Sequence, residues 1–191
     1  MINKYTNKQR GLLAVIMAMV MVFAGAAFVA AEVDATITYA DENKTATVTT
    51  VEELETVLGE IEGSGTYKDV NKIVLGSDLT VSEDLTIDKN VTIDGNKHTI
   101  SVDKDCVVMV TSNVEIKNVK FNLDGDGADG ADDASIDINE SGIEVSFTDV
   151  EIVGESEYGV STIYEKTPTV NFNKVKFNNH KYSPNYNCIA T

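Results

Sequence analysis

Apolar and polar residues alternate in short segments between Val91 and Phe177, and three of these segments share one pattern. Alternation over four to eight residues predicts a half-buried β-strand. Each copy of the pattern consists of two short alternating runs joined by a tight turn. The three copies are Val114–Phe121, Val145–Ile152 and Val170–Phe177, and a looser copy, Val91–Ile100, precedes them with an Asp-Gly-Asn-Lys turn.

The spacing of the copies indicates a stacked repeat. Ile93, Ile116, Phe147 and Phe172 hold the same place in successive copies, at intervals of 23, 31 and 25 residues, and periods of about 20–50 residues are typical of solenoids, propellers and arrays. One copy cannot bury its apolar side alone, whereas copies stacked at about 4.8 Å share a continuous interior. The pattern therefore predicts an all-β parallel β-helix in which these four residues form one interior column. A twisted antiparallel sandwich of hairpins is the alternative.

The turns within the copies fit the same architecture. Asn118 and Asp149 occupy equivalent positions, and both residue types tolerate a left-handed backbone. Lys174 fills the third such position, where it fits less readily.

A short amphipathic helix is expected before the repeat, at about residues 51–62. Thr50 and Glu53 form a capping box, Gly63 and Gly65 are expected to end the helix, and the apolar residues at helical spacing are Val51, Leu54, Val57, Leu58 and Ile61. An uncovered sheet edge is an aggregation risk, so we assign the helix to cap the open N-terminal end of the stack. A helix lying on the outer wall is the alternative.

These elements divide the chain into segments. Residues 1–31 form a leader, residues 32–48 contain two strands or a linker (ATITYA and KTATVTT, the latter running to Thr50), and residues 49–191 form the β-helix domain, with coils at about 70–178 and a tail at 179–191. The tail carries no helix, anchor or cap, which suggests either a fragment of a longer repeat protein or a tail folded over the last coil.

The run IVLGSDLTVSEDLTIDKNVTIDGNKHTI, from Ile73 to Ile100, resembles the early coils of pectate-lyase-like right-handed parallel β-helix domains. It is most similar to the adhesive branch found in adhesin-like surface proteins of methanogenic archaea and some bacteria. The resemblance extends from about Thr49 to Phe177. Its hydrophobic ladder and TIDGN turn are specific for fold and weak for activity, and they imply a cell-surface adhesin-like protein.

The resemblance also identifies the residues that an enzyme would need. Pectate lyases use an arginine base with acids that hold Ca²⁺, but the only arginine here is Arg10, in the leader. The Gly-His-Gly and Arg-x-Lys elements of polygalacturonases are absent, and His98 and His180 are isolated in the sequence. We therefore expect no catalytic residues, although paired acids such as Asp132-Asp133 leave a glycan-cleaving enzyme as an alternative.

The N-terminus predicts export. Lys4, Lys8 and Arg10 precede an uncharged stretch from Gly11 to Ala31, which ends in the plausible cleavage site Val29-Ala30-Ala31. A retained membrane anchor and a pilin-type leader cut near Gly11, with the apolar run kept as an assembly helix, are the alternatives. All three place the remaining chain outside the cytoplasm.

Charge restricts the partners. The chain has 15 basic and 31 acidic residues, a net charge of −16; without the three basic leader residues the charge is 12 − 31 = −19. Nucleic-acid binding needs clustered Lys and Arg, so we expect a surface glycan or a neighbouring surface protein as partner. Contact with a membrane is expected only through the N-terminal segment.

An acidic, glycine-rich stretch from Asp124 to Glu140 is expected to form a loop. It interrupts the repeat, and its spacing fails the EF-hand pattern at Ala128, Asp129 and Ser135. Calcium is nevertheless the one cofactor it suggests, against a plain solvated loop. The candidate metal ligands are Asp124, Asp126, Asp129, Asp132 and Asp133.

Two further features are weaker signals. Cys106 and Cys188 are the only cysteines; about three rungs separate them, too far for a disulfide unless the tail folds back, so we expect Cys106 to be a buried small apolar residue. Three glycosylation sequons begin at Asn43, Asn90 and Asn139.

The sequence thus favours an exported, non-enzymatic adhesin-like protein, with a polysaccharide lyase or hydrolase and a pilin-like filament subunit as alternatives.

Overall fold

The computed structural model describes residues 35–40, 43–125, 134–156, 158–162 and 166–178. The chain divides into two units, Met1–Glu32 and Val33–Thr191, and every described residue lies in the second unit. The predicted leader and the tail at residues 179–191 lie outside the described residues. No helix within the described ranges is long and apolar enough to cross a membrane.

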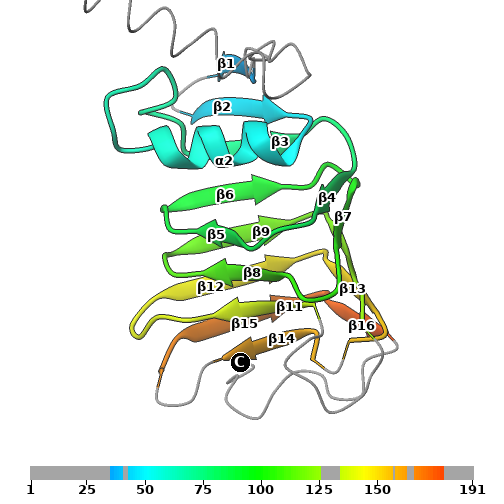
Figure 1. The fold of residues 1–191 in the computed structure, drawn as a ribbon. Helices are drawn as coiled ribbons and strands as arrows, with labels where there is room; N and C mark the ends of the chain where they lie inside the picture. The colour runs from blue at the N-terminus through cyan, green and yellow to red at the C-terminus, as the bar shows by residue number, and fades with distance from the viewer. Residues whose placement is uncertain (1–34, 41–42, 126–133, 157, 163–165, 179–191) are drawn as a thin grey trace, which may run out of the picture. The chain divides into compact units, whose positions relative to one another are not determined.

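Three β-sheets form the walls of the described unit, and within each sheet the strands of successive turns lie one above the other (Figure 1). The first sheet has the strand order β1-β2-β3-β6-β9-β12-β15, with bounds Thr36–Ala40, Asn43–Val48, Lys72–Leu75, Val91–Asp94, Val114–Lys117, Glu144–Thr148 and Thr169–Asn173. The second sheet contains β4 (Leu79–Val81), β7 (Thr99–Val102), β10 (Lys120–Leu123), β13 (Glu151–Gly154) and β16 (Lys176–Asn178). The third contains β5 (Leu85–Ile87), β8 (Val107–Val110), β11 (Ser135–Ile138) and β14 (Val160–Thr162).

The chain visits the three sheets in turn, so each strand pairs in parallel with the strand one turn later. The exception is the hairpin of β1 with β2, which is antiparallel. This topology confirms the predicted parallel β-helix, with about five turns that begin at β3, and excludes the antiparallel sandwich. The two N-terminal strands expected from ATITYA and KTATVTT are β1 and β2.

The predicted interior column is present in the first sheet. Ile93 pairs in register with Ile116, Ile116 with Phe147, and Phe147 with Phe172. The first three are buried, with Phe147 fully inaccessible, and the rings of Phe147 and Phe172 are stacked with centroids 5.4 Å apart. Because side chains alternate along a strand, every second residue of each run joins this shared interior.

Single left-handed residues turn the chain from the first sheet into the second. Asn118, Asp149 and Lys174 have φ of 52°, 53° and 55°, as their equivalent positions predict. A residue that has a Cβ is strained at positive φ, and Asn and Asp bear this strain best because their short side chains can form local hydrogen bonds.

Each complete turn contains three strands, whereas the sequence pattern predicts two. The additional strands form the third sheet, and one of them corrects the loop prediction for Asp124 to Glu140. Residues Ser135–Ile138 form β11, in which Ile136 and Ile138 are buried. Their alternation with polar neighbours is the ordinary strand signal, but the surrounding acids and glycines obscured it.

Helix α2 (Val51–Glu60) begins as predicted and ends earlier than expected. The Thr50 side chain accepts a hydrogen bond from the backbone N–H of Glu53, and Glu53 Oε2 accepts one from the N–H of Thr49. After the helix Glu62, rather than a glycine, takes the left-handed conformation, with φ of 64°. The expectation that Gly63 and Gly65 end the helix is therefore wrong.

The helix occupies the turn that precedes the first complete rung, where it contacts β2 and β4 (Figure 1). Leu54, Val57, Leu58 and the adjoining Ile61 are buried. Because β4 is the first strand of the second sheet, the helix covers the N-terminal end of the stack, as predicted, instead of lying on the outer wall.

Candidate functional site

The acidic loop is only partly described. Asp124 is exposed, its N–H donates to the Val102 carbonyl at 2.9 Å, and its own carbonyl accepts from the N–H of Ala134 at 2.9 Å. The first bond ties the start of the loop to the neighbouring rung, and the second joins the two ends of the loop to each other. The other candidate ligands, Asp126, Asp129, Asp132 and Asp133, lie outside the described residues. The calcium site stays a prediction, and no group of three His, Cys, Asp or Glu within the described ranges is arranged to hold a metal ion.

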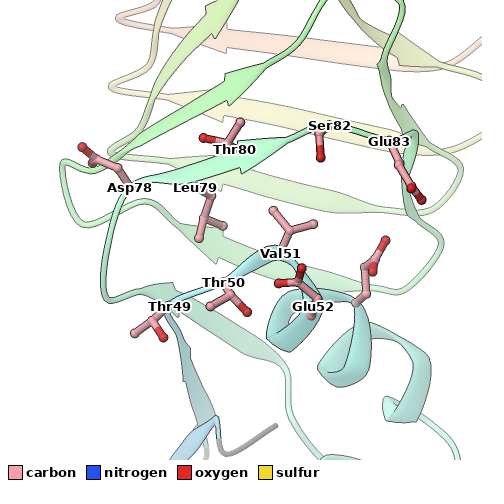
Figure 2. A pocket seen from close by; sticks show the side chains of 10 residues that line it. Thr49, Thr50, Val51, Glu52, Asp78, Leu79, Thr80, Ser82 and Glu83 are labelled. Atoms are coloured by element: carbon pink, nitrogen blue, oxygen red, sulfur yellow. The ribbon is translucent and has the colours of Figure 1, made fainter. Parts of the chain in front are cut away.

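A polar cleft of about 400 Å³ lies beside the first turn of α2 (Figure 2). Four carboxylates line it, together with the hydroxyls of Thr49, Thr50, Thr80 and Ser82. The carboxylates are those of Glu52, Glu55, Asp78 and Glu83. No lysine, histidine or cysteine is among the lining residues, so the cleft offers hydrogen-bond acceptors and hydroxyls and disfavours anionic ligands.

Two of the cleft's carboxylates are held in the ionised form. The pKa of Asp78 is lowered, first by the backbone N–H of Thr99, which donates to Oδ1 at 2.8 Å, and then by His98. The pKa of Glu52 is lowered by its own backbone N–H and by the Thr50 hydroxyl. Hydrogen bonds to an ionised carboxylate favour that form, so the cleft stays negative at neutral pH.

The outward face of the first sheet is a polar wall. A shallow depression of about 590 Å³ crosses β6, β9 and β12. Within it Thr92 Oγ1 donates to Glu115 Oε2 at 3.1 Å, and Lys117 Nζ pairs with the same oxygen at 3.0 Å. Asn171 Nδ2 donates to Glu144 Oε1 at 2.8 Å. Side chains on adjacent rungs thus fix one another in rows, which gives a partner a rigid surface of donors and acceptors.

The histidine in the described residues does not face a nucleophile. His98 stands at the start of a strand with its side chain 32% exposed, and Nδ1 lies 3.2 Å from Asp78 Oδ1. His98 is thus a partly exposed residue that pairs with a carboxylate. His180 lies outside the described residues.

Cys106 is buried at the corner between the second and third sheets. Burial raises the pKa of its thiol, and Asp103 raises it further, so the reactive thiolate is disfavoured. This fits the expected role as a small apolar residue. Cys188 lies outside the described residues, so its pairing stays a prediction.

The glycosylation sequons differ in exposure. Asn90 is exposed, whereas Asn139 is half-buried and its Nδ2 lies 3.7 Å from the Met109 sulfur. Of the two, Asn90 is the better placed to carry a glycan.

The sequence reasoning missed both the cleft and the polar wall. Each combines residues from segments far apart in the chain, such as Glu52 with Asp78, so no motif of neighbouring residues predicts either feature. The outward positions of the repeat were visible as the polar half of the alternation, but their side-chain pairing across rungs depends on the register.

Comparison with known proteins gives one match. The model of a family described as "Putative pectate lyase-like adhesive domain" matches residues 26–187. No curated protein and no solved structure matches the chain.

Proposed function

Because the chain belongs to the pectate lyase-like adhesive domain family, we propose that it is an exported, non-enzymatic cell-surface protein that binds a surface glycan or a neighbouring surface protein. The family match, which covers most of the chain, carries the proposal. The N-terminal sequence supports the export step, since a basic start and an apolar run precede Glu32.

The stacked sheets suit binding better than catalysis. Their outward side chains are fixed in rows by contacts between rungs, as Thr92 and Glu115 illustrate. Such a wall loses little conformational freedom when a partner binds, which favours affinity. The sole arginine is Arg10, in the leader, so the arginine base of the pectate lyases has no counterpart in the mature part.

Adhesion is tested by coating beads with the exported protein and measuring their retention on intact cells and on immobilised cell-surface polysaccharides. Beads coated with heat-unfolded protein are the matched control. Retention that requires the folded protein supports the proposal, whereas equal retention of both bead types on every surface would contradict it.

Catalysis and export are tested separately. Incubation with polygalacturonate and calcium should produce neither unsaturated-uronide absorbance nor new reducing ends. Appearance of either, abolished by heating, would establish an enzyme.

N-terminal sequencing of the exported protein should give Glu32 as the first residue; a start near Gly11 would instead support the filament subunit.

A further inference from the structure

A second groove, of about 470 Å³, runs along the corner where the first sheet turns into the second. We call it the lysine groove, because four lysines line it: Lys97, Lys120, Lys174 and Lys176. Its other lining residues are Asn118, Val119, Asp149, Val150 and Glu151. The chain has 15 basic residues, of which three precede residue 31, so 4 of the remaining 15 − 3 = 12 meet in this one groove.

The lysines are spread along the stacking axis. Lys120 pairs in register with Glu151, and Glu151 with Lys176, while Lys97 precedes β7, one turn before Lys120. At about 4.8 Å per rung, Lys97 and Lys174 are separated by roughly 14 Å along the axis. The positive charges therefore form a row, which suits an extended ligand lying parallel to the axis.

Three of these ammonium groups are available for a ligand. Among the described residues, Lys97, Lys120 and Lys176 form no ion pair, and all three are exposed. Lys174 Nζ lies 3.4 Å from Asp149 Oδ1, and Glu151 accepts a hydrogen bond from Asn178 Nδ2 at 3.0 Å. Four lysines against two acids give the groove a local charge of +2 in a chain whose net charge is −16.

The floor of the groove is apolar and rigid. Val119 and Val150 are buried, and the left-handed residues before them, Asn118 and Asp149, set the corner. Asn118 Nδ2 is held by Asp94 Oδ1 at 3.0 Å. Because the two valines are buried, the groove presents mainly its lysines, and a ligand with regularly spaced negative charges would match that row.

From this arrangement we propose that the lysine groove binds an anionic polysaccharide, a polymer of sugars that carry carboxylate or sulfate groups. The inference rests on the proposed adhesive function and names the class of glycan and its binding site. Lysine contributes point charges suited to single anionic groups, in contrast to the bidentate fork of arginine, which the mature part lacks. The groove volume of about 470 Å³ lies within the range of small-molecule ligand sites, so it would hold a short stretch of the polymer.

Other polyanions fit less well. A stable protein partner needs an interface of about 800 Å² on each side, whereas only nine residues line this groove. Single-stranded nucleic acid binds through aromatic stacking platforms, and no aromatic residue lines the groove. An acidic protein segment is therefore an outcome for the test to distinguish.

The first experiment measures binding of the purified protein to polygalacturonate and to dextran sulfate, with neutral dextran and poly-glutamate as comparison probes. The corner variant replaces the four groove lysines with glutamine. The control variant makes the same charge change elsewhere, at Lys68, Lys89, Lys104 and Lys166. At an ionic strength of about 0.1 M, where exposed charges act over about 10 Å, we expect the corner variant to weaken binding about tenfold or more and the control variant to weaken it about threefold or less.

The second experiment removes negative charge from the groove and predicts tighter binding. In Asp149→Asn the left-handed conformation is kept and Lys174 is released from its ion pair, while Glu151→Gln keeps an acceptor for Asn178. The matched control is Asp105→Asn with Glu62→Gln, since both residues are exposed and both are left-handed, with φ of 68° and 64°. The groove pair should bind the anionic polysaccharide about three- to tenfold more tightly, and the control pair should not.

The results separate the inference from the function on which it rests. Polysaccharide binding that is equal in corner and control variants would overturn the groove assignment, and so would preferential binding of poly-glutamate. Beads that adhere to cells equally well with either variant would likewise overturn the groove assignment and leave the adhesive function standing. Absence of adhesion by the wild-type protein on every surface would overturn the adhesive function itself.

Discussion

Truncation of Phe147 tests whether the interior column stabilises the stack. Phe147 is fully buried between Ile116 and Phe172 and stacks on the latter ring. Phe→Ala in a core costs about 3–5 kcal/mol through lost transfer energy and the cavity left behind. The lost ring pair lies within that figure, at about 0.5–1.5 kcal/mol. We therefore expect Phe147→Ala to lower the free energy of unfolding by about 4 kcal/mol.

Urea denaturation followed by far-UV circular dichroism measures this loss. With an m value of about 2 kcal/mol per molar, a loss of about 4 kcal/mol moves the midpoint by about 2 M. Phe147→Leu is the control, because it keeps most of the volume and should cost less than about 1.5 kcal/mol. Phe172→Ala should cost less than Phe147→Ala, since Phe172 is only half-buried. A loss below about 1 kcal/mol for Phe147→Ala would show that the column does not stabilise the fold.

Four further predictions concern the cap, the rungs, an acid and the loop. Thr50→Ala should destabilise α2 by about 1 kcal/mol, measured by thermal melting, with Thr86→Ala as an exposed control. Gly154→Ala should lower the melting temperature, because Gly154 has φ of 139° and an added Cβ would overlap the Leu123 carbonyl; an unchanged melting temperature would contradict the close approach. The pKa of Asp94 is lowered, because hydrogen bonds, chiefly from Asn118 and Lys72, outweigh the desolvation that raises it. The ionised form of Asp94 therefore stabilises the fold fully above about pH 3.8, the ordinary pKa of an aspartate, and this stabilisation is lost as the pH falls through the lowered pKa. Melting temperatures measured against pH for Asp94→Asn should lack that part of the acid transition. Replacing residues 126–133 with a short Gly-Ser link should leave stability nearly unchanged, because each doubling of loop length costs only about 0.6 kcal/mol; a large drop in the urea midpoint would place the loop in the core.

The sequence predicted the features that depend on one residue or on a few residues close together in the chain. The column through Phe147 follows from alternation, the corners follow from Asn118 and Asp149, and the cap follows from Thr50 and Glu53. Each depends on a few neighbouring positions, so a pattern of spacing is enough to find it.

Features that depend on register were not predictable in the same way. The strand at Ser135–Ile138 was hidden because acids and glycines precede it, although its side chains alternate. The lysine groove had a visible signal, since Lys120 and Lys176 stand at the same place in two copies. Whether Lys97 lies in the same groove as these two lysines depends on which rungs are adjacent, and the sequence pattern alone does not give that order.

The hydrogen bonds between rungs run along the axis of the stack, and this direction matters when the protein is pulled. A tether that loads the chain from one end opens the terminal rung first, because each rung is bonded only to its neighbours. The interval from Ile93 to Ile116 is 23 residues, and a released rung of that length adds roughly 75–80 Å of extended chain. Under force such a protein would lengthen in discrete steps while its remaining rungs stay folded. Each step would lower the peak force on the attachment during a sudden pull.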